Sequence, residues 1–508
     1  MHLSRAAFCA LLLAAAAARF TLAAAGSCEE LTSLAVSGAT ITRAESVAPG
    51  AFVLPGGTGG QAAQNAVYAT LPPFCRVAAT LTPTRDSDIK IEIWLPAANW
   101  NGKFQAVGNG GWSGAIAYPA MAAALGHGYA ASSTDTGHAG STAEFALGHP
   151  EKLVDFASRS VHEMTVAAKQ VVTAHYGKAP SFSYWRGCSA GGRQGLKEAQ
   201  QFPADFDGIV AGAPASDWTG RAAQSMRVAQ ILHRDEASNI SSDQYRLLHR
   251  AVLAACDARD GVTDGVLENP RACTFDPVVL QCSGAADSPC LTRQQVDAAR
   301  RIYTGAKNPQ SGRLITGLEP GSELGWATWG GPQPFAIGRD HFRYVVFKNP
   351  QWDPRQFDFD VDVVRAEEGE GSAINALDPD LRPFFGRGGK LLQYHGWNDP
   401  QISPGSSVQY YERVVERVGG AAMDNAYRLF MVPGMAHCSG GEGPSTFDPM
   451  TALEEWVERG RPPATLEASM VRDGKVARTR PLCPYPQTAA YKGAGSTDDA
   501  ANFTCKTR

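Results

Sequence analysis

The chain has 508 residues, of which 44% are hydrophobic and 19% are charged, and its formal net charge is -4 at pH 7. This composition excludes a disordered chain, and the slightly negative charge excludes a strongly basic surface for nucleic acid. Small molecules or neutral polymers are therefore the expected partners, and the length allows one large core or two.

The first 25 residues have the pattern of a secretory signal peptide. Arg5 precedes an apolar run over residues 6–18, and three alanines end the segment at Ala25. A membrane anchor is the weaker interpretation, because the run is too short to span a bilayer and Arg19 interrupts it. Loss of these two arginines takes the net charge from -4 to -6. We therefore predict a secreted or periplasmic protein with no membrane attachment after cleavage.

Ten cysteines remain after the one in the predicted signal peptide, Cys9, is removed. An even number in an exported protein predicts disulfides, although many pairings are formally possible. Short separations along the chain favour three local pairs, namely Cys256 with Cys273, Cys282 with Cys290, and Cys483 with Cys505.

From Cys75 to about residue 216, strand-like and helix-like patterns alternate. Strands are predicted over residues 76–81, 89–94, 103–107, 129–134, 182–185 and 207–214, and helices over 119–125, 152–176 and 196–202. The first two strands are separated by a polar turn and are expected to pair with each other. The later alternation of helix and strand predicts an α/β fold in which crossover helices join parallel strands.

The regular pattern stops at about residue 217 and returns at about residue 388. The intervening sequence is rich in Trp, Pro and Gly and holds four of the ten remaining cysteines, which indicates an inserted domain. Strands then follow at 390–396 and 427–432, with a helix that includes residues 408–418 and a final helix near 452–458. The predicted organisation is a core formed by residues 26–216 and 388–508, with residues 217–387 inserted into it.

A Gly-x-Ser-x-Gly motif at residues 187–191 joins a predicted strand to a predicted helix. This is the pattern of a nucleophile elbow, with Ser189 at a sharp turn. Side chains at Gly187, Gly191 or Gly192 would collide with neighbouring backbone in such a turn. The motif alone leaves open a plain glycine-rich loop, because the chain contains 53 glycines.

A serine nucleophile needs a histidine to accept its proton and a carboxylate to orient that histidine. In α/β-hydrolases the chain order is serine, acid and histidine, with the last two in loops after late strands. Asp399 follows the 390–396 strand and His437 follows the 427–432 strand. The joint placement predicts a catalytic triad of Ser189, Asp399 and His437.

Four other histidines receive weaker assignments. His162 and His175 fall on the long predicted helix and are interpreted as packing or surface residues. We interpret His395 as a structural neighbour of the acid, and His138 as a pocket candidate.

The oxyanion of an acyl-transfer intermediate needs fixed N–H donors. In this fold they come from the residue after the serine and from an early glycine-rich loop. The corresponding residues are Ala190 and either Gly110 or Gly111. Without the serine motif, the same loop would be interpreted as a flexible turn.

Cys188 directly precedes the predicted nucleophile, and Cys438 directly follows the predicted base. If Ser189 and His437 meet, these cysteines meet as well. Their disulfide would close a loop of 250 residues, a constraint worth roughly 5 kcal/mol in the chain-entropy estimate.

These motifs together resemble the tannase and feruloyl esterase family, which also includes the terephthalate half-ester hydrolase MHETase. The resemblance rests on the Cys-Ser and His-Cys dipeptides, the Gly-Gly-Arg-Gln sequence after Ser189 and the His-Gly-Trp-Asn-Asp acid loop. It covers nearly the whole chain after the signal peptide. It implies an α/β-hydrolase core, a large lid at residues 217–387, and a fifth disulfide between Cys28 and Cys75.

The segment 257–266 sets three carboxylates three or four residues apart, with glycines between them. Ca²⁺ prefers several carboxylate and carbonyl oxygens on a curled loop. The spacing departs from the EF-hand pattern, so the residues alone leave open a solvated acidic turn. The family resemblance implies a structural calcium site in the lid, with ligands from Asp257, Asp260, Val262, Asp264 and Val266.

The predicted lid offers aromatic side chains for a substrate pocket, namely Trp326, Trp329, Phe335, Phe342, Tyr344 and Trp352. Arg339 and Arg343 are candidates to meet a free carboxylate. The resulting hypothesis is a secreted serine esterase that hydrolyses small aromatic acid esters through an acyl-enzyme without an organic cofactor.

The sequence leaves the preferred acid open among gallate, ferulate, other hydroxycinnamates and terephthalate half-esters. The alternatives to the esterase are a serine peptidase and a calcium-dependent exported binding protein without turnover.

Overall fold

The computed structural model describes residues 27–55, 66–284, 289–331 and 333–507. The predicted signal peptide lies outside these residues. Among the described helices, none is both long and apolar enough to cross a membrane.

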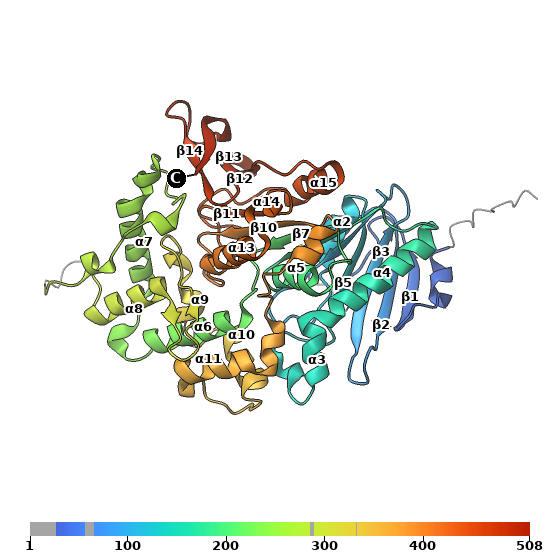
Figure 1. Cartoon of the computed structure of the whole chain (residues 1–508), viewed down its shortest axis with the longest axis horizontal. Helices are drawn as coiled ribbons and strands as arrows, with labels where there is room; N and C mark the ends of the chain where they lie inside the picture. The colour runs from blue at the N-terminus through green and yellow to red at the C-terminus, as the bar shows by residue number, and fades with distance from the viewer. Residues whose placement is uncertain (1–26, 56–65, 285–288, 332, 508) are drawn as a thin grey trace, which may run out of the picture.

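The described residues form a nine-stranded sheet in the order β1-β2-β3-β5-β4-β6-β7-β10-β11 (Figure 1). Its strands are β1 Ala39–Val47, β2 Phe74–Leu81, β3 Ile89–Pro96, β4 Lys103–Val107, β5 Ala130–Thr134, β6 Phe182–Cys188, β7 Gly208–Gly212, β10 Lys390–Gly396 and β11 Tyr427–Val432. The neighbours from β5 to β11 are parallel, whereas β1, β2, β3 and β5 pair antiparallel. This confirms the predicted α/β fold, although the sequence analysis missed β1.

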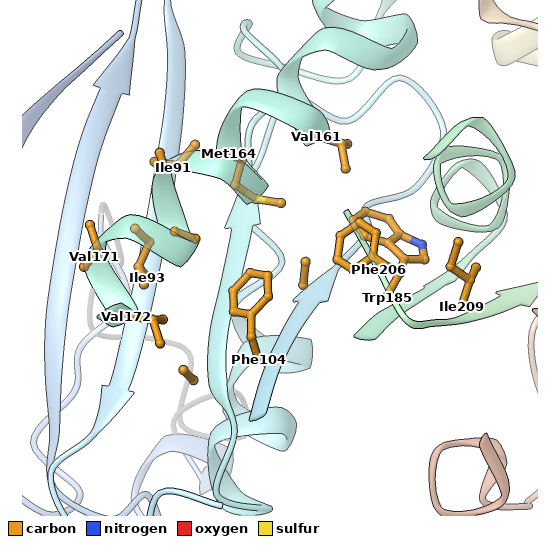
Figure 2. Close-up of a cluster of buried hydrophobic side chains, with 14 of the residues drawn as sticks. Ile91, Ile93, Phe104, Val161, Met164, Val171, Val172, Trp185, Phe206 and Ile209 are labelled. Atoms are coloured by element: carbon orange, nitrogen blue, oxygen red, sulfur yellow. The ribbon is translucent and has the colours of Figure 1, made fainter. Parts of the chain in front are cut away.

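Helices cover both faces of the sheet. The core helices are α2 Tyr118–Gly126, α3 Pro150–Val154, α4 Ser160–Tyr176, α5 Ala190–Gln201, α13 Pro404–Val418 and α15 Pro449–Arg459. Helices α4, α5 and α13 bury side chains in one apolar cluster, and α2 and α15 bury theirs in another. Figure 2 shows Met164 and Val172 of α4 beside Phe104 of β4 and Ile93 of β3. A sheet covered on both faces explains why β7 is buried along its whole length.

The predicted long helix over residues 152–176 is interrupted in the structure. A π-helical turn, Asp155–Arg159, separates α3 from α4. The main-chain carbonyls of Phe156 and Ala157 in this turn accept hydrogen bonds from the buried Arg193 guanidinium. Helical periodicity did not reveal the interruption, because Arg193, which binds the carbonyls of this turn, lies in a different helix, α5.

The 217–387 segment was expected to be irregular, but much of it is helical. It contains α6 Trp218–Leu232, α7 Ser242–Cys256, α8 Arg293–Thr304, α9 Ala327–Gly330, α10 Ala336–Asp340, α11 Phe359–Glu368, α12 Arg382–Gly386 and a hairpin of β8 Ala306–Lys307 and β9 Leu314–Ile315. Capping boxes at Ser241 and Thr292 begin α7 and α8, a local signal that the sequence analysis overlooked. The segment has an apolar cluster of its own, which includes Leu248 and Trp326.

The C-terminal region adds two small antiparallel sheets that were not predicted. Their strands are β12 Leu466–Arg472 with β13 Lys475–Leu482, and β14 Gln487–Tyr491 with β15 Phe503–Thr507. The ten cysteines of the described residues form the five predicted disulfides, Cys28–Cys75, Cys188–Cys438, Cys256–Cys273, Cys282–Cys290 and Cys483–Cys505.

Candidate active site

Ser189 lies at the turn between β6 and α5 with φ 63° and ψ -123°. A non-glycine residue with this backbone conformation is strained and needs strong support from its surroundings. The Ser189 amide donates to the Gly212 carbonyl at 3.0 Å, and the Ser189 carbonyl accepts from the Ala215 amide at 3.1 Å. The end of β7 therefore holds the turn.

The glycines around Ser189 are required by close backbone contacts. A Cβ atom on Gly187 would lie 2.4 Å from the Gly191 carbonyl oxygen, and one on Gly192 would lie 2.3 Å from the Gly212 carbonyl oxygen. Neither backbone atom can yield as a flexible side chain would. The motif is thus a tight strand-to-helix turn rather than a loose glycine-rich loop.

The early glycine-rich loop packs against this turn. A Cβ atom on Gly108 would lie only 2.6 Å from the Gly191 Cα atom. The Gln194 side-chain amide donates to the Asn109 side-chain oxygen at 2.9 Å, which links the loop to α5. Gly110 and Gly111 follow directly in the loop. Ala190 is the first residue of α5, and amides at that position have no acceptor within a helix.

Asp399 and His437 are joined by a hydrogen bond. The His437 Nδ1–H donates to Asp399 Oδ2 at 2.7 Å, and Asp399 Oδ1 accepts from the amides of Gln401 and Ile402 at 2.7 and 3.0 Å. The Asp399 side chain is fully buried, whereas 13% of the His437 side chain is exposed. Burial opposes the carboxylate charge, but the charge of His437 and the histidine hydrogen bonds outweigh it and hold the pKa of Asp399 below its usual range.

Two further side chains support the acid. His395 Nε2 lies 3.1 Å from Asp399 Oδ2, which confirms its interpretation as a structural neighbour, and its Nδ1 lies 2.7 Å from Ser407 Oγ. Arg221 of α6 donates from Nε to the Gln401 carbonyl at 2.8 Å, and burial lowers the pKa of this guanidinium to about 10. The sequence analysis missed Arg221, because nothing in its local sequence indicates contact with the acid loop.

A disulfide joins Cys188 and Cys438, the neighbours of Ser189 and His437 in the sequence, and their Cα atoms lie 6.0 Å apart. No hydrogen bond joins Ser189 to His437 within the described part of the chain. Such catalytic bonds are often long in proteins without substrate and shorten when substrate binds.

The glycine-rich loop also contacts the 217–387 segment. Trp112 donates from Nε1 to the Ile337 carbonyl at 3.1 Å, and a Cβ atom on Gly111 would lie 3.1 Å from the Ile337 side chain. His138 supports the same tryptophan, because its Nε2 lies 2.9 Å from the Trp112 carbonyl oxygen and its ring stacks on Phe145. The structure thus gives His138 a supporting contact beneath the loop.

Several of the predicted aromatic pocket walls belong to apolar clusters of the 217–387 segment. Trp326 and Trp329 are buried in one cluster, and Phe342 and Trp352 in another. Phe335 packs against the first cluster, whereas Tyr344 packs with Trp112 near the glycine-rich loop. The composition could not separate these groups, because core and pocket use the same residue types.

The two candidate arginines for a substrate carboxylate have partners of their own. Arg339 pairs with Asp340 at 3.0 Å, and Arg343 donates to the Trp352 carbonyl at 3.2 Å.

In the acidic loop 257–266, Asp257 accepts from the amides of Asp264 and Gly265, and Asp260 accepts from those of Val262 and Glu268. A cavity of about 10 Å³ is lined by Asp260, Val262, Asp264, Val266 and Glu268, among others. That volume is about one water-sized sphere. Asp264 forms ion pairs with Arg478 and Arg480 of β13, so the C-terminal region shares this site.

The mostly parallel sheet, the strained serine turn and the acid and histidine loops after β10 and β11 define an α/β-hydrolase. Residues 75–506 match the family model described as tannase and feruloyl esterase. The chain therefore belongs to the tannase and feruloyl esterase family, and it is a carboxylic ester hydrolase.

Individual relatives agree with this assignment. An uncharacterised esterase of Xanthomonas campestris is 37% identical, over 96% of this chain and 92% of its own length. A probable feruloyl esterase B-1 of Aspergillus flavus is 36% identical, over 85% of this chain and 86% of its own. The crystal structure of feruloyl esterase B from Aspergillus oryzae superposes with a TM-score of 0.88 at 32% identity, covering 94% of this chain and 99% of that chain.

Proposed function

We propose that this esterase hydrolyses esters of aromatic carboxylic acids through an acyl-enzyme on Ser189. The observation that carries the proposal is the 2.7 Å hydrogen bond from His437 to the buried Asp399, combined with the disulfide between Cys188 and Cys438, the residues next to Ser189 and His437. A histidine held in this way has its other ring nitrogen available to accept a proton.

In the proposed reaction, His437 Nε2 takes the proton of Ser189 Oγ as that oxygen attacks the ester carbonyl. The Ala190 amide and an amide of Gly110 or Gly111 stabilise the resulting oxyanion. His437 then gives its proton to the leaving alkoxide, and the alcohol departs. Water, activated by the same histidine, cleaves the acyl-enzyme and releases the acid. Asp399 stays ionised throughout and stabilises the imidazolium.

The feruloyl esterase names of the relatives and the aromatic side chains beside the glycine-rich loop support an aromatic acyl group. A substrate panel tests this proposal, with methyl ferulate, another hydroxycinnamate ester, a gallate ester and a terephthalate half-ester. We expect hydrolysis of at least one of these esters, and its loss in Ser189→Ala. A preference for the terephthalate half-ester would indicate the alternative function, a hydrolase of terephthalate half-esters.

Two other functions make different predictions in the same assay. An exported binding protein without turnover would bind these esters and leave them intact. A peptidase would cleave the amide analogue of an ester at a comparable rate. Hydrolysis of the amide but not the ester would overturn the esterase proposal.

We infer that the 217–387 segment acts as a lid over the site. Contacts at both catalytic loops support this role, namely Ile337 on the glycine-rich loop and Arg221 on the acid loop. The five disulfides and the N-terminal apolar segment support export to an oxidising compartment.

We also propose that the acidic loop holds a structural Ca²⁺. Its ligands would be the carboxylates of Asp257, Asp260 and Asp264 with the carbonyls of Val262 and Val266. Four of these residues, Asp260, Val262, Asp264 and Val266, line the small cavity, and they offer hard oxygen ligands around a space for one ion. Asp257 is joined to the same loop by its hydrogen bonds from the amides of Asp264 and Gly265. The ion would add positive charge among buried carboxylates, and hydrolysis at Ser189 needs no metal.

A further inference from the structure

Three side chains with metal-binding atoms meet on the sheet face that α4 and α5 cover, outside the active site and the acidic loop. They are His162 of α4, Glu198 of α5 and Asp205 in the connection to β7. One ligand atom from each lies within 4.8 Å of the others. Figure 2 shows their sequence neighbours Val161 and Phe206 in the buried cluster beneath.

No donor group of the cluster reaches the carboxylate of Glu198, which lies beside the carboxylate of Asp205. The Glu198 side chain is buried, with 1% of the residue exposed, and neither carboxylate oxygen has a hydrogen bond in the described structure. A buried carboxylate without donors is costly unless a cation or a proton neutralises it. A carboxylate oxygen of Glu198 lies within 4.8 Å of the ligand atoms of His162 and Asp205, as the ligands of one metal ion would.

The other two side chains are oriented for the same position. The His162 ring stacks on Phe202, with centroids 3.9 Å apart and planes 9° apart, which fixes the plane of the imidazole. Its Nδ1 lies 2.6 Å from Asp205 Oδ2. The His162 side chain is 30% exposed and that of Asp205 is 11% exposed, so both side chains are partly accessible to solvent.

We propose that His162, Glu198 and Asp205 bind a divalent transition metal of the Zn²⁺ class. One imidazole and two carboxylates suit this class, whose bonds to nitrogen and oxygen are about 2.0–2.2 Å. In a tetrahedral site the ligand atoms are then about 3.3 Å apart. A fourth position would remain for water. The ion would tie α4 to α5, the helix that begins directly after Ser189.

A bound ion would replace the contact between His162 Nδ1 and Asp205 Oδ2. Lys169 of α4 donates to the main-chain carbonyl of Asp205 rather than to its carboxylate. The competing arrangement is a proton shared between Glu198 and Asp205, since burial and Asp205 raise the pKa of Glu198 well above its usual range. If a proton is shared between the two carboxylates, added Zn²⁺ should not bind there, whereas a metal site should bind it.

The test uses the full chain, from which metals are first removed with a chelator. The chain is then returned to a chelator-free buffer that contains Ca²⁺ in all later steps. Zn²⁺ or Co²⁺ is then added, and bound metal is measured by equilibrium dialysis. We expect one Zn²⁺ per chain, a rise of a few degrees in the unfolding temperature, and visible absorption bands from bound Co²⁺. Absence of bound Zn²⁺ and of Co²⁺ bands in the unmodified chain would overturn the proposal without any variant.

Two variants locate the site. Glu198→Gln and His162→Gln should lose the bound Zn²⁺ and the thermal shift. Glu163→Gln should keep both, because Glu163 adjoins His162 on α4 but lies outside the cluster. If Glu198→Gln binds as much Zn²⁺ as the unmodified chain, the ion binds at another site and the proposal is overturned.

Discussion

The serine side and the histidine side of the site are held by different means. Ser189 sits in a turn whose shape depends on missing side chains, because backbone atoms lie where Cβ atoms of Gly187 and Gly192 would be. His437 is held by side chains that are present, through its hydrogen bond to Asp399 and the disulfide of Cys438. Substitutions that add atoms near Ser189 should therefore lower turnover, and so should substitutions that remove atoms near His437.

The largest effect on turnover is expected from Asp399→Asn. An asparagine preserves the shape of the acid but favours the wrong tautomer of His437, a change that lowers kcat by about 10⁴ in a related arrangement. Steady-state kinetics on methyl ferulate measures it. Asp297→Asn is the control, because Asp297 is half-exposed on α8 and pairs with Arg301. A loss below tenfold would mean that Asp399 does not orient the base.

Adding one methyl group on the serine side should have the next largest effect. In Gly192→Ala the new Cβ would lie 2.3 Å from the Gly212 carbonyl oxygen and 2.9 Å from Pro214 Cα. A displacement of about 1 Å at a catalytic group can lower the rate about a hundredfold. Gly126→Ala is the matched control, since a Cβ there meets nothing within 4 Å. Kinetics and circular dichroism would separate lost activity from lost fold, and wild-type turnover would contradict the steric account.

Removing the disulfide between the two sides should also lower turnover. Replacing Cys188 and Cys438 with alanine frees the spacing of Ser189 and His437, and we expect a loss approaching a hundredfold at a temperature where the variant is folded. Replacing Cys282 and Cys290, which close a loop with a sequence separation of 8 residues, should leave turnover nearly unchanged. Equal losses in the two double variants would show that the bridge only stabilises the fold.

The smallest effect on turnover is expected from chelation. If the acidic loop holds Ca²⁺ for structure alone, a chelator lowers the unfolding temperature by a few degrees while room-temperature hydrolysis continues. Thermal unfolding and activity are measured on the same sample. Immediate loss of activity in a chain that is still folded by circular dichroism would place the metal in the chemistry.

The sequence predicted the serine side well because its signal is local. Gly187, Ser189 and Gly192 lie within six positions, and the contacts that require the glycines come from the turn and the next strand. Most strands of the sheet could be predicted equally well, since runs of apolar residues reflect burial directly. Strand β1 was missed because most of its residues are not buried, which leaves a weak apolar pattern.

Contacts between distant segments could not be predicted in the same way. Arg221 reaches the acid loop across 180 residues, and Trp112 reaches Ile337 across 225. His162 looked like an ordinary helix residue, because Glu198 and Asp205 come from other elements. Local patterns do not record which partner a side chain meets in the fold.

Covalent labelling of the nucleophile tests the central claim most directly. A fluorophosphonate reacts with a serine only when a neighbouring base activates it, and peptide mass spectrometry then locates the label. We predict one phosphonyl group per chain on Ser189, slower labelling in the presence of excess methyl ferulate, and no labelling in His437→Ala. Continued ester hydrolysis with Ser189 unlabelled, or a label on a different residue, would contradict the account.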